Sequence, residues 1–382
     1  MKVAVLKETR PGERRVALVP KGVEELIRAG GEVRIEAGAG EGAGITDREY
    51  GDAGATVGSA AETLEGAELV LRINPPSTSD PDELAALPEG VILISFLNPL
   101  TRPDLVRRLA DGGTTAIAME MVPRITRAQS MDALSSQATV AGYKAVLMAA
   151  DRLPKLLPMF TTAAGTIRPG KVLILGAGVA GLQAIATARR LGAVVDAFDV
   201  RPAVKEQVES LGARFLEADE DMAAEGEGGY AKELSEEQHE KELALISGAI
   251  TEADIVVSTA QIPGREAPTL VTEEMVTSMR PGSVIVDLAA PSGGNCVLTR
   301  TGESVTHQGV VIIGPDNLPA EIPVHASQMY SKNIVTLAQE LLGEDGAVAL
   351  DFDNDVIGPA TVTHAGEVRN ERVKSTLEKA SA

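Results

Sequence analysis

Three glycines stand at a spacing that can bind a phosphate group. Gly176, Gly178 and Gly181 have the G-x-G-x-x-G pattern and follow the apolar run 172–175, which is typical of a parallel strand buried on both faces. Gly176 permits a tight turn, Gly178 lets the backbone approach a pyrophosphate, and Gly181 lets a helix expected at 182–191 lie close to the sheet. The pyrophosphate would lie on the free N–H groups at the start of that helix.

An acidic residue follows at the distance that recognition of a ribose requires. A second predicted strand, 194–198, ends in Asp199, eighteen residues beyond Gly181. A carboxylate there accepts hydrogen bonds from the adenosine ribose hydroxyls and favours NAD(H), because a 2′-phosphate would face like charge. Arg201 keeps the alternative open, since an arginine nearby can receive a 2′-phosphate. Strand, glycines, helix, strand and acid together predict a dinucleotide site.

Composition excludes several classes of partner. The formal net charge is −20 and aromatic residues make up 2% of the chain, so nucleic acid and anionic membrane surfaces are not expected as direct partners. The single cysteine, Cys296, excludes an internal disulfide and fits a reducing compartment, and a small buried residue is its simpler interpretation. No apolar run approaches the roughly 18 residues that span a bilayer, so we expect a soluble chain. None of the four histidines has metal-ligand spacing with another, so we predict no metal site.

The order of apolar runs predicts the fold class. Residues 2–120 alternate short apolar strands with helical stretches, which indicates a second α/β unit without a glycine pattern. We therefore expect an α/β protein with two Rossmann-like, doubly wound parallel-sheet domains joined by long helices. The expected boundaries are 1–134 for the first domain, rejoined by 343–382, then 135–326 for the NAD-binding domain and 327–342 for a return linking helix.

A polar loop precedes the long amphipathic helix expected at 135–152. Five side chains of residues 121–136 offer donors and acceptors there: Arg124, Arg127, Gln129, Asp132 and Ser135. A polar loop at a domain junction commonly borders a cleft, which favours a ligand contact. Helix capping by Asp132 or Ser135 explains the same residues equally well.

Further candidates lie at the strand ends of the second domain and in an acidic segment. Strand ends of an open parallel sheet collect ligands, so residues at or just after the ends of the predicted strands 255–259 and 284–287 are candidates for the nicotinamide side: Thr259, Ala260, Gln261 and Asp287. Residues 217–242 carry eleven acids against two lysines and include Gly229 and Tyr230. So long an insertion with glycine hinges is either a mobile lid or a disordered surface.

Four motifs resemble one family over essentially the whole chain. They are residues 7–17 (KETRPGERRVA), 124–132 (RITRAQSMD), 228–233 (GGYAKE) and 316–320 (DNLPA). They are similar to the soluble NAD(H)-binding subunit, or domain I, of proton-translocating NAD(P) transhydrogenases, in the superfamily that also holds alanine dehydrogenase. The first motif is shared with alanine dehydrogenase and the saccharopine-forming enzymes, whereas the second and third are typical of the transhydrogenase.

The resemblance implies roles for particular residues. Arg124, Gln129 and Asp132, with Ser135 beside them, would hold the nicotinamide end, and Tyr230 would lie on a mobile loop that closes over NAD(H). Further nucleotide contacts are implied for Val179, Asp199, Val200, Arg201, Gly229 and Gln261. Where the family pattern has a glutamine contact, this chain has Glu242, so that contact is not carried over.

Alanine dehydrogenase is the main alternative, and two residues oppose it. That enzyme needs a lysine to orient pyruvate and a histidine as acid and base, because hydride delivery to a keto or imino carbon requires a proton. In the matching segments, 71–75 and 94–98, the two places are held by Asn74 and Asn98. Neither side chain donates a proton near neutral pH. A non-enzymatic module that senses NAD is a third possibility.

The resemblance also implies an assembly. The chain would be the catalytic NAD(H) subunit of a Re/Si-specific, proton-translocating NAD(P)⁺ transhydrogenase, exchanging hydride with NADP(H) on a separate partner subunit. The proton channel would lie on a membrane-spanning subunit. We expect a homodimer in the cytoplasm, attached peripherally to the inner face of the cell membrane through these partners.

Overall fold

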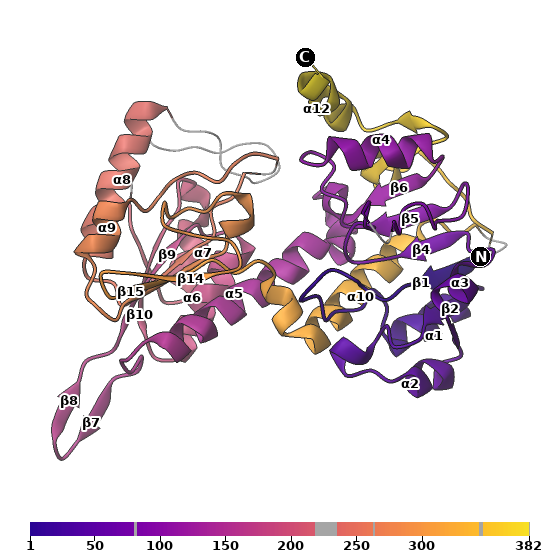
Figure 1. Ribbon diagram of the computed structural model, residues 1–382. Coiled ribbons are helices and arrows are strands. Elements are labelled where there is room, and N and C mark those ends of the chain that lie inside the picture. The colour runs from indigo at the N-terminus through magenta and orange to yellow at the C-terminus, as the bar shows by residue number, and fades with distance from the viewer. Residues whose placement is uncertain (80–81, 218–234, 263, 344–346, 382) are drawn as a thin grey trace. The chain divides into compact units, whose positions relative to one another are not determined.

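The computed structural model describes residues 1–382 except 80–81, 218–234, 263, 344–346 and 382 (Figure 1). The chain forms two compact units, one made of Met1–Gln137 with Pro319–Ala382 and the other of Ala138–Leu318. The first unit thus contains the helix expected at 327–342 as a linker, which runs from Pro323 to Gln339. Within the described residues, no helix combines the length and the apolar character that crossing a membrane requires.

The first unit is an eight-stranded sheet in the order β17-β16-β6-β5-β4-β1-β2-β3, parallel except at β16 and β17. Its strands are β1 (Lys2–Val5), β2 (Glu32–Glu36), β3 (Thr56–Gly58), β4 (Leu69–Leu71), β5 (Ile92–Ser95), β6 (Thr115–Ala118), β16 (Thr361–His364) and β17 (Glu367–Val368). Its α-helices are α1 (Pro20–Arg28), α2 (Asp47–Asp52), α3 (Ala60–Leu64), α4 (Pro103–Asp111), α10 (Pro323–Gln339), α11 (Ile357–Ala360) and α12 (Glu371–Ser381). Val3 and Val5 pack with α1 and α10, whereas Ala4 packs with α4 on the other face.

The second unit has a seven-stranded sheet in the order β11-β10-β9-β12-β13-β15-β14, with β14 alone antiparallel. Its strands are β9 (Lys171–Leu175), β10 (Val194–Phe198), β11 (Arg214–Phe215), β12 (Ile255–Ser258), β13 (Val284–Asp287), β14 (Ser304–His307) and β15 (Val310–Ile313). Its helices are α6 (Val179–Arg190), α7 (Lys205–Ser210), α8 (Glu236–Ile250) and α9 (Glu273–Ser278), and α5 (Ala133–Arg152) enters it from the first unit.

Strand β9 shows why the second sheet is wound on both sides. Val172 and Ile174 lie in one apolar cluster with α5, α6 and α7, whereas Leu173 and Leu175 lie in another with α8 and α9. Because neighbouring residues of a strand point to opposite faces, an apolar run without alternation needs helices on both. Figure 1 shows this arrangement, and the predicted fold class, two Rossmann-like α/β units, is confirmed.

Three local features differ from the sequence predictions. The long helix begins at Ala133 rather than Ser135. A hairpin of β7 (Phe160–Thr162) and β8 (Gly165–Ile167), which the sequence did not predict, extends from the second unit with all six strand residues exposed (Figure 1). The acidic segment 217–242 is not a loop throughout, because α8 starts at Glu236 with a capping box between Ser235 and Gln238.

A buried carboxylate fills the carboxyl edge of the first sheet. Counted from β1, this sheet has the strand order 3-2-1-4-5, whose crevice between strands 1 and 4 is a common place for nucleotides. Here Glu8, just after β1, accepts the backbone N–H groups of Ile73 (2.7 Å) and Asn74 (3.2 Å), just after β4. The Glu8 side chain therefore occupies the backbone N–H groups that a ligand in this crevice would need. Glu8 is only 9% exposed, and this burial raises the pKa of its carboxyl.

A second buried carboxylate joins the ends of β5 and β6. Oε1 of Glu120 accepts the N–H groups of Leu97, at 2.8 Å, and of Asn98, whose φ is +50°. Oε2 is buried and has no hydrogen-bond partner among the residues that the structure describes. Burial raises the pKa of Glu120 from 4.5 to about 7, against the backbone N–H groups of Glu120 itself, Asn98 and Leu97, which lower it.

The pKa of Glu120 predicts a pH-dependent stability. The folded chain binds this proton more tightly than the unfolded chain, so the free energy of unfolding should fall as pH rises from 4.5 to about 7. At 1.36 kcal/mol per pKa unit, this fall in the free energy of unfolding is about 3 kcal/mol. Glu120→Gln should abolish it, because glutamine does not titrate. Chemical denaturation from pH 5 to 8 measures it, with the exposed Glu89→Gln as control. Equal pH profiles for wild type and Glu120→Gln would contradict the prediction.

Candidate functional site

The predicted glycine turn lies between β9 and α6, where the strand order of the second sheet reverses. Gly176 has φ +93°, which an L side chain rarely adopts. A Cβ on Gly181 would lie 1.9 Å from the carbonyl oxygen of Gly176, so helix α6 can pack this closely only on glycine. The roles predicted for these two glycines are thus visible in the backbone.

Gly178 meets the requirement of a phosphate cradle. A Cβ built on it would have no atom within 4 Å, so the backbone there is open to a close approach. Gly178 is also the N-cap of α6 and provides no side-chain cap for the first N–H groups of this twelve-residue helix. Val179, the first helical residue, is 40% exposed. These residues fit a pyrophosphate held on backbone N–H groups.

The carboxylate of Asp199 binds both the glycine turn and the nearby Arg201. Its carboxylate accepts the N–H of Ala177 at 2.7 Å and the backbone N–H of Arg201 at 2.9 Å. The guanidinium of Arg201 adds hydrogen bonds from Nε (2.8 Å) and Nη2 (2.7 Å). Asp199 is 7% exposed, and Val200 between the two is half-buried. The predicted ribose acceptor is therefore also an ion-pair partner, which the sequence did not indicate.

The candidates at the end of β12 divide into two groups. The hydroxyl of Thr259 donates to the carbonyl of Gly176 at 3.0 Å and so holds the glycine turn, and the N–H of Ala260 donates to Asn295. Gln261 is exposed, with its side-chain amide on the carbonyl of Leu288. Thr259 and Ala260 therefore border the glycine turn, whereas the Gln261 side chain binds Leu288.

Asp287 has a different role from the predicted one. Its oxygens accept hydrogen bonds from five groups, which are the hydroxyls of Ser258 and Thr299 and the N–H groups of Ala289, Asn295 and Cys296. The side chain is fully buried, so Asp287 organises the interior instead of facing a ligand. Burial raises the pKa of the neighbouring Cys296 to about 11, which agrees with the structural interpretation of this cysteine.

Gly142 is a positioning residue that the sequence did not reveal. A Cβ on it would lie 2.1 Å from the carbonyl oxygen of Ala180, in the first turn of α6. Helix α5 therefore lies against the start of α6 through a glycine, which fixes the helix end that the phosphate would meet. Glycine is required at position 142 only because α5 contacts α6, which is distant in sequence. No local sequence pattern could therefore have predicted this requirement.

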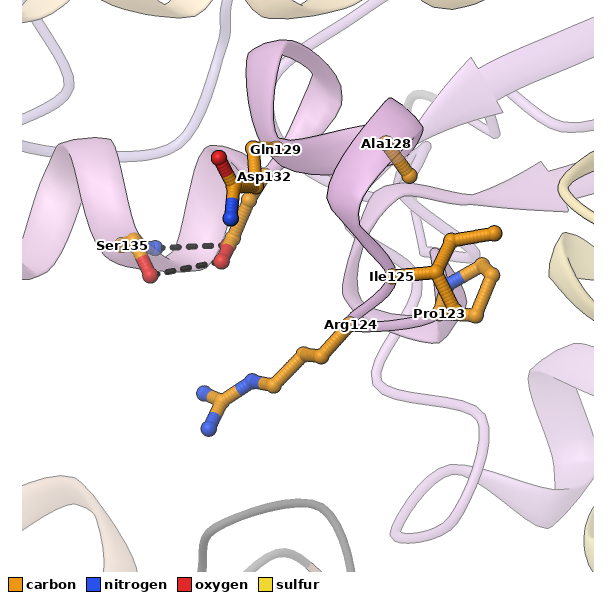
Figure 2. Close-up of a pocket in the computed structure, with 7 residues that line it drawn as sticks. All are labelled: Pro123, Arg124, Ile125, Ala128, Gln129, Asp132 and Ser135. Atoms are coloured by element: carbon orange, nitrogen blue, oxygen red, sulfur yellow. Dashed lines mark hydrogen bonds between the residues drawn. The ribbon is translucent and has the colours of Figure 1, made fainter.

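The polar loop lines a small cavity in the first unit. The cavity has a volume of about 190 Å³, is open to solvent, and is lined by Pro123, Arg124, Ile125, Ala128, Gln129, Asp132 and Ser135 (Figure 2). The structure thus brings together the four residues to which the resemblance assigns the nicotinamide. Figure 2 shows Arg124 extending away from its loop. Gln129 is exposed, so its amide is accessible.

Asp132 is bound to Ser135 in the way that a helix cap would be. One carboxylate oxygen accepts the Ser135 N–H at 2.8 Å and the other accepts its hydroxyl at 2.6 Å (Figure 2). The capping alternative therefore describes these two residues in the structure. Capping does not remove these two residues from the cavity, because Asp132 and Ser135 both line it.

Buried neighbours and helix α10 hold this loop in place. Ala128, Met131 and Ala133 are in the core of the first unit, which turns Gln129 and Asp132 outward. From α10, the amide of Asn333 donates to the carbonyl of Ser130 at 2.8 Å. The loop is thus fixed by its apolar residues and presents its polar ones.

Arg127, the remaining polar side chain of the loop, has a structural role. Its guanidinium forms ion pairs with Glu340 and Asp355 and a hydrogen bond with Asn354. These acceptors raise the pKa of Arg127. Arg127 does not line the cavity, which narrows the predicted donor set to Arg124 and Gln129.

Asn74 and Asn98, the two residues that argue against an alanine dehydrogenase, have different surroundings. Asn74 is buried, and its amide donates to Glu8 and Glu13, both at 2.9 Å. Glu13 also pairs with Arg15, which holds the pKa of Glu13 at about 2 although burial opposes this. Arg15 is thus neutralised by a carboxylate of its own chain. Asn98 is exposed.

Two predicted residues, Gly229 and Tyr230, lie outside the described part of the chain. Within the part that the structure describes, no group of three or more His, Cys, Asp and Glu side chains is arranged to hold a metal ion.

Comparisons with known proteins cover nearly the whole chain. The model for the alanine dehydrogenase/PNT N-terminal domain matches residues 4–141, and that for the C-terminal domain matches residues 145–371. The chain is 46% identical to an NAD(P) transhydrogenase alpha subunit of Rhodospirillum rubrum, over 96% of this chain and 97% of that protein. It is 32% identical to the alanine dehydrogenase of Bacillus subtilis, over 99% and 95%.

A solved structure agrees with these matches. The transhydrogenase from Sinorhizobium meliloti superposes with a TM-score of 0.88 at 44% identity, covering 96% of this chain and all of that one. The glycine turn, Asp199 and the loop at 123–135 thus stand in a chain that belongs to the alanine dehydrogenase/PNT family and is more similar to these transhydrogenase subunits than to alanine dehydrogenase.

Proposed function

We propose that this chain is the NAD(H)-binding subunit of a proton-translocating NAD(P) transhydrogenase. The observation that carries the proposal is the glycine turn of the second unit. Gly176 and Gly181 allow a backbone contact that no other residue fits, and Gly178 leaves the start of α6 open to a pyrophosphate. The identity of 46% to a transhydrogenase alpha subunit supports the same conclusion.

The absence of an acid and base at two positions favours transhydrogenation over alanine oxidation. NAD(H) would supply a hydride at C4 of its nicotinamide, and transfer to a second nicotinamide ring releases no proton. Asn74 donates its amide N–H groups to two carboxylates, and neither Asn74 nor Asn98 can act as a Brønsted acid near neutral pH. Catalysis is then mainly positioning, in which two rings must meet at roughly 3–3.5 Å. Arg124, Gln129, Asp132 and Ser135 are the residues that we assign to orient the nicotinamide.

The resemblance in sequence supports the remaining parts of the proposal. NADP(H) is bound by a separate partner subunit, and a membrane-spanning subunit couples Re/Si-specific hydride transfer to proton movement. The chain forms a homodimer in the cytoplasm, held at the inner face of the cell membrane through its partners. We assign Gly229 and Tyr230 a part in binding NAD(H), as the resemblance implies.

One assay tests this function against the alternative. NADH oxidation by the purified chain is followed with pyruvate and ammonium, and separately with the NADP-loaded partner subunit. We expect oxidation only with the partner. Oxidation with pyruvate would identify an amino-acid dehydrogenase, and NADH binding without turnover in either assay would identify a sensing module.

The variant Gln129→Ala tests whether the loop at 123–135 orients the nicotinamide ring. The side chain is exposed and lines the cavity, so its removal should slow hydride transfer at least about tenfold through lost orientation of the ring while NADH affinity stays within a few-fold. Ser130→Ala is the matched control, because its side chain is exposed one residue along but does not line the cavity. Unchanged transfer by Gln129→Ala would remove this loop from the mechanism.

Asp199→Asn tests the ribose contact. Asparagine has one acceptor oxygen instead of two, so the ribose hydroxyls must compete with Ala177 and Arg201, and NADH affinity should fall about tenfold or more. Calorimetric titration measures it. The control is Asp196→Asn, since Asp196 lies on β10 three residues before Asp199 and pairs with the exposed Arg214. Equal affinity in wild type and Asp199→Asn would refute the ribose assignment.

A further inference from the structure

A buried side-chain amide lies behind the loop at 123–135. Asn333, on α10, is only 7% exposed. Its Nδ2 donates to the carbonyl of Ser130 at 2.8 Å, and its Oδ1 accepts the hydroxyl of Ser136 at 2.7 Å. Ser130 follows Gln129 in the loop, whereas Ser136 lies in the first turn of α5. One side chain therefore joins the two chain segments that line the cavity.

A second link crosses the same bend, on the side of the cavity. Asp132 binds Ser135, and both side chains line the cavity (Figure 2). Solvent and a ligand compete for these polar atoms. The two hydrogen bonds of Asn333 lie in the poorly solvated interior, where hydrogen bonds are electrostatically stronger. Asn333 thus supplies the link that persists when a ligand occupies the cavity.

The partners of Asn333 fix the orientation of its amide. A carbonyl oxygen only accepts hydrogen bonds, so Nδ2 must face Ser130 and Oδ1 must face the hydroxyl of Ser136. The same direction continues behind Ser136, because Nε2 of Gln137 donates to its Oγ at 3.2 Å and Nη1 of Arg15 donates to Oε1 of Gln137 at 2.9 Å. Each group donates to the next along a mostly buried chain of hydrogen bonds that ends at the loop, and such chains strengthen their members.

Resting on the proposed function, we propose that Asn333 is a positioning residue for hydride transfer. Its amide sets the distance between the loop at Ser130 and the first turn of α5, and thereby the placement of Gln129 and Ser135 around the nicotinamide. A displacement of about 1 Å can cost roughly a hundredfold in rate. The affinity for NADH depends mainly on the glycine turn of the other unit, so loss of this amide should slow transfer more than it weakens binding.

Asn333→Leu in the full-length chain tests this role. Leucine has the same branched arrangement of side-chain atoms but makes neither hydrogen bond. We expect single-turnover hydride transfer to the NADP-loaded partner subunit to slow at least about tenfold, while the NADH affinity measured by calorimetric titration stays within about threefold of wild type. Gln328→Leu is the matched control at an exposed position of α10, and should leave transfer and affinity unchanged.

Asn333→Asp provides a readout that lost stability alone does not change. A protonated carboxyl donates to the Ser130 carbonyl as the amide does, whereas an ionised carboxyl presents an oxygen to that carbonyl. Relative to wild type at each pH, transfer should fall at least about fivefold as this carboxyl ionises between about pH 5 and about pH 9. The nearest cation along the hydrogen-bond chain, Arg15, is already paired with Glu13. Circular dichroism at each pH gives the folded fraction, to which the rate is normalised.

Ser136→Ala tests whether Asn333 acts by joining the two segments. Alone, this variant removes one of the two hydrogen bonds and should slow transfer less than Asn333→Leu does. Added to Asn333→Leu, it should have no further effect on transfer, because its partner is already absent. Effects that multiply in the double variant would show that Ser136 acts independently, and would overturn the joining role.

The outcomes distinguish this inference from the proposed function. Normal transfer by Asn333→Leu overturns the positioning role, and so does a pH profile of Asn333→Asp that is parallel to wild type. A loss of NADH affinity as large as the loss of transfer also overturns it, because the amide would then support binding rather than orientation. Wild-type protein that transfers no hydride to the partner subunit overturns the proposed function itself.

Discussion

The chemistry of the second unit depends on one very close backbone contact. The carbonyl oxygen of Gly176 lies where a Cβ of Gly181 would be, so strand β9 and helix α6 meet at a distance that only glycine allows. Gly142 of α5 makes a similar approach to Ala180 of α6. The start of α6 is thereby fixed by backbone atoms, and its unpaired N–H groups point where a phosphate can lie.

Side chains around this turn hold it rather than reach outward. Thr259 donates to Gly176, and Asp199 accepts the N–H of Ala177 while it binds Arg201. A rigid turn of this kind is ordered during folding, so less conformational freedom is lost when a ligand binds.

The two units show how one strand order can serve two purposes. Both sheets follow the order 3-2-1-4-5, yet the first has no glycine turn, and Glu8 occupies the backbone N–H groups between β1 and β4. Its crevice is closed by the chain's own carboxylate. What the first unit offers instead is the loop at 123–135, which its apolar residues anchor in the core and its contact with α10 holds. A shared topology thus permits a site but does not create one.

The sequence determined those features that depend on neighbours along the chain. The apolar run at 172–175 specified a strand buried on both faces, and the spacing of Gly176, Gly178 and Gly181 specified the turn, because strand, turn and helix follow one another directly. Tertiary structure alone decided which polar groups face a ligand. Asp287 is occupied by five internal donors, and Arg127 by the carboxylates of Glu340 and Asp355. The partners of Arg127 lie far away in sequence, and so does Ala180, whose close approach requires glycine at position 142. Local sequence patterns determine secondary-structure propensity and residue spacing. The burial and the partners of a polar side chain are determined only when segments distant in sequence pack together.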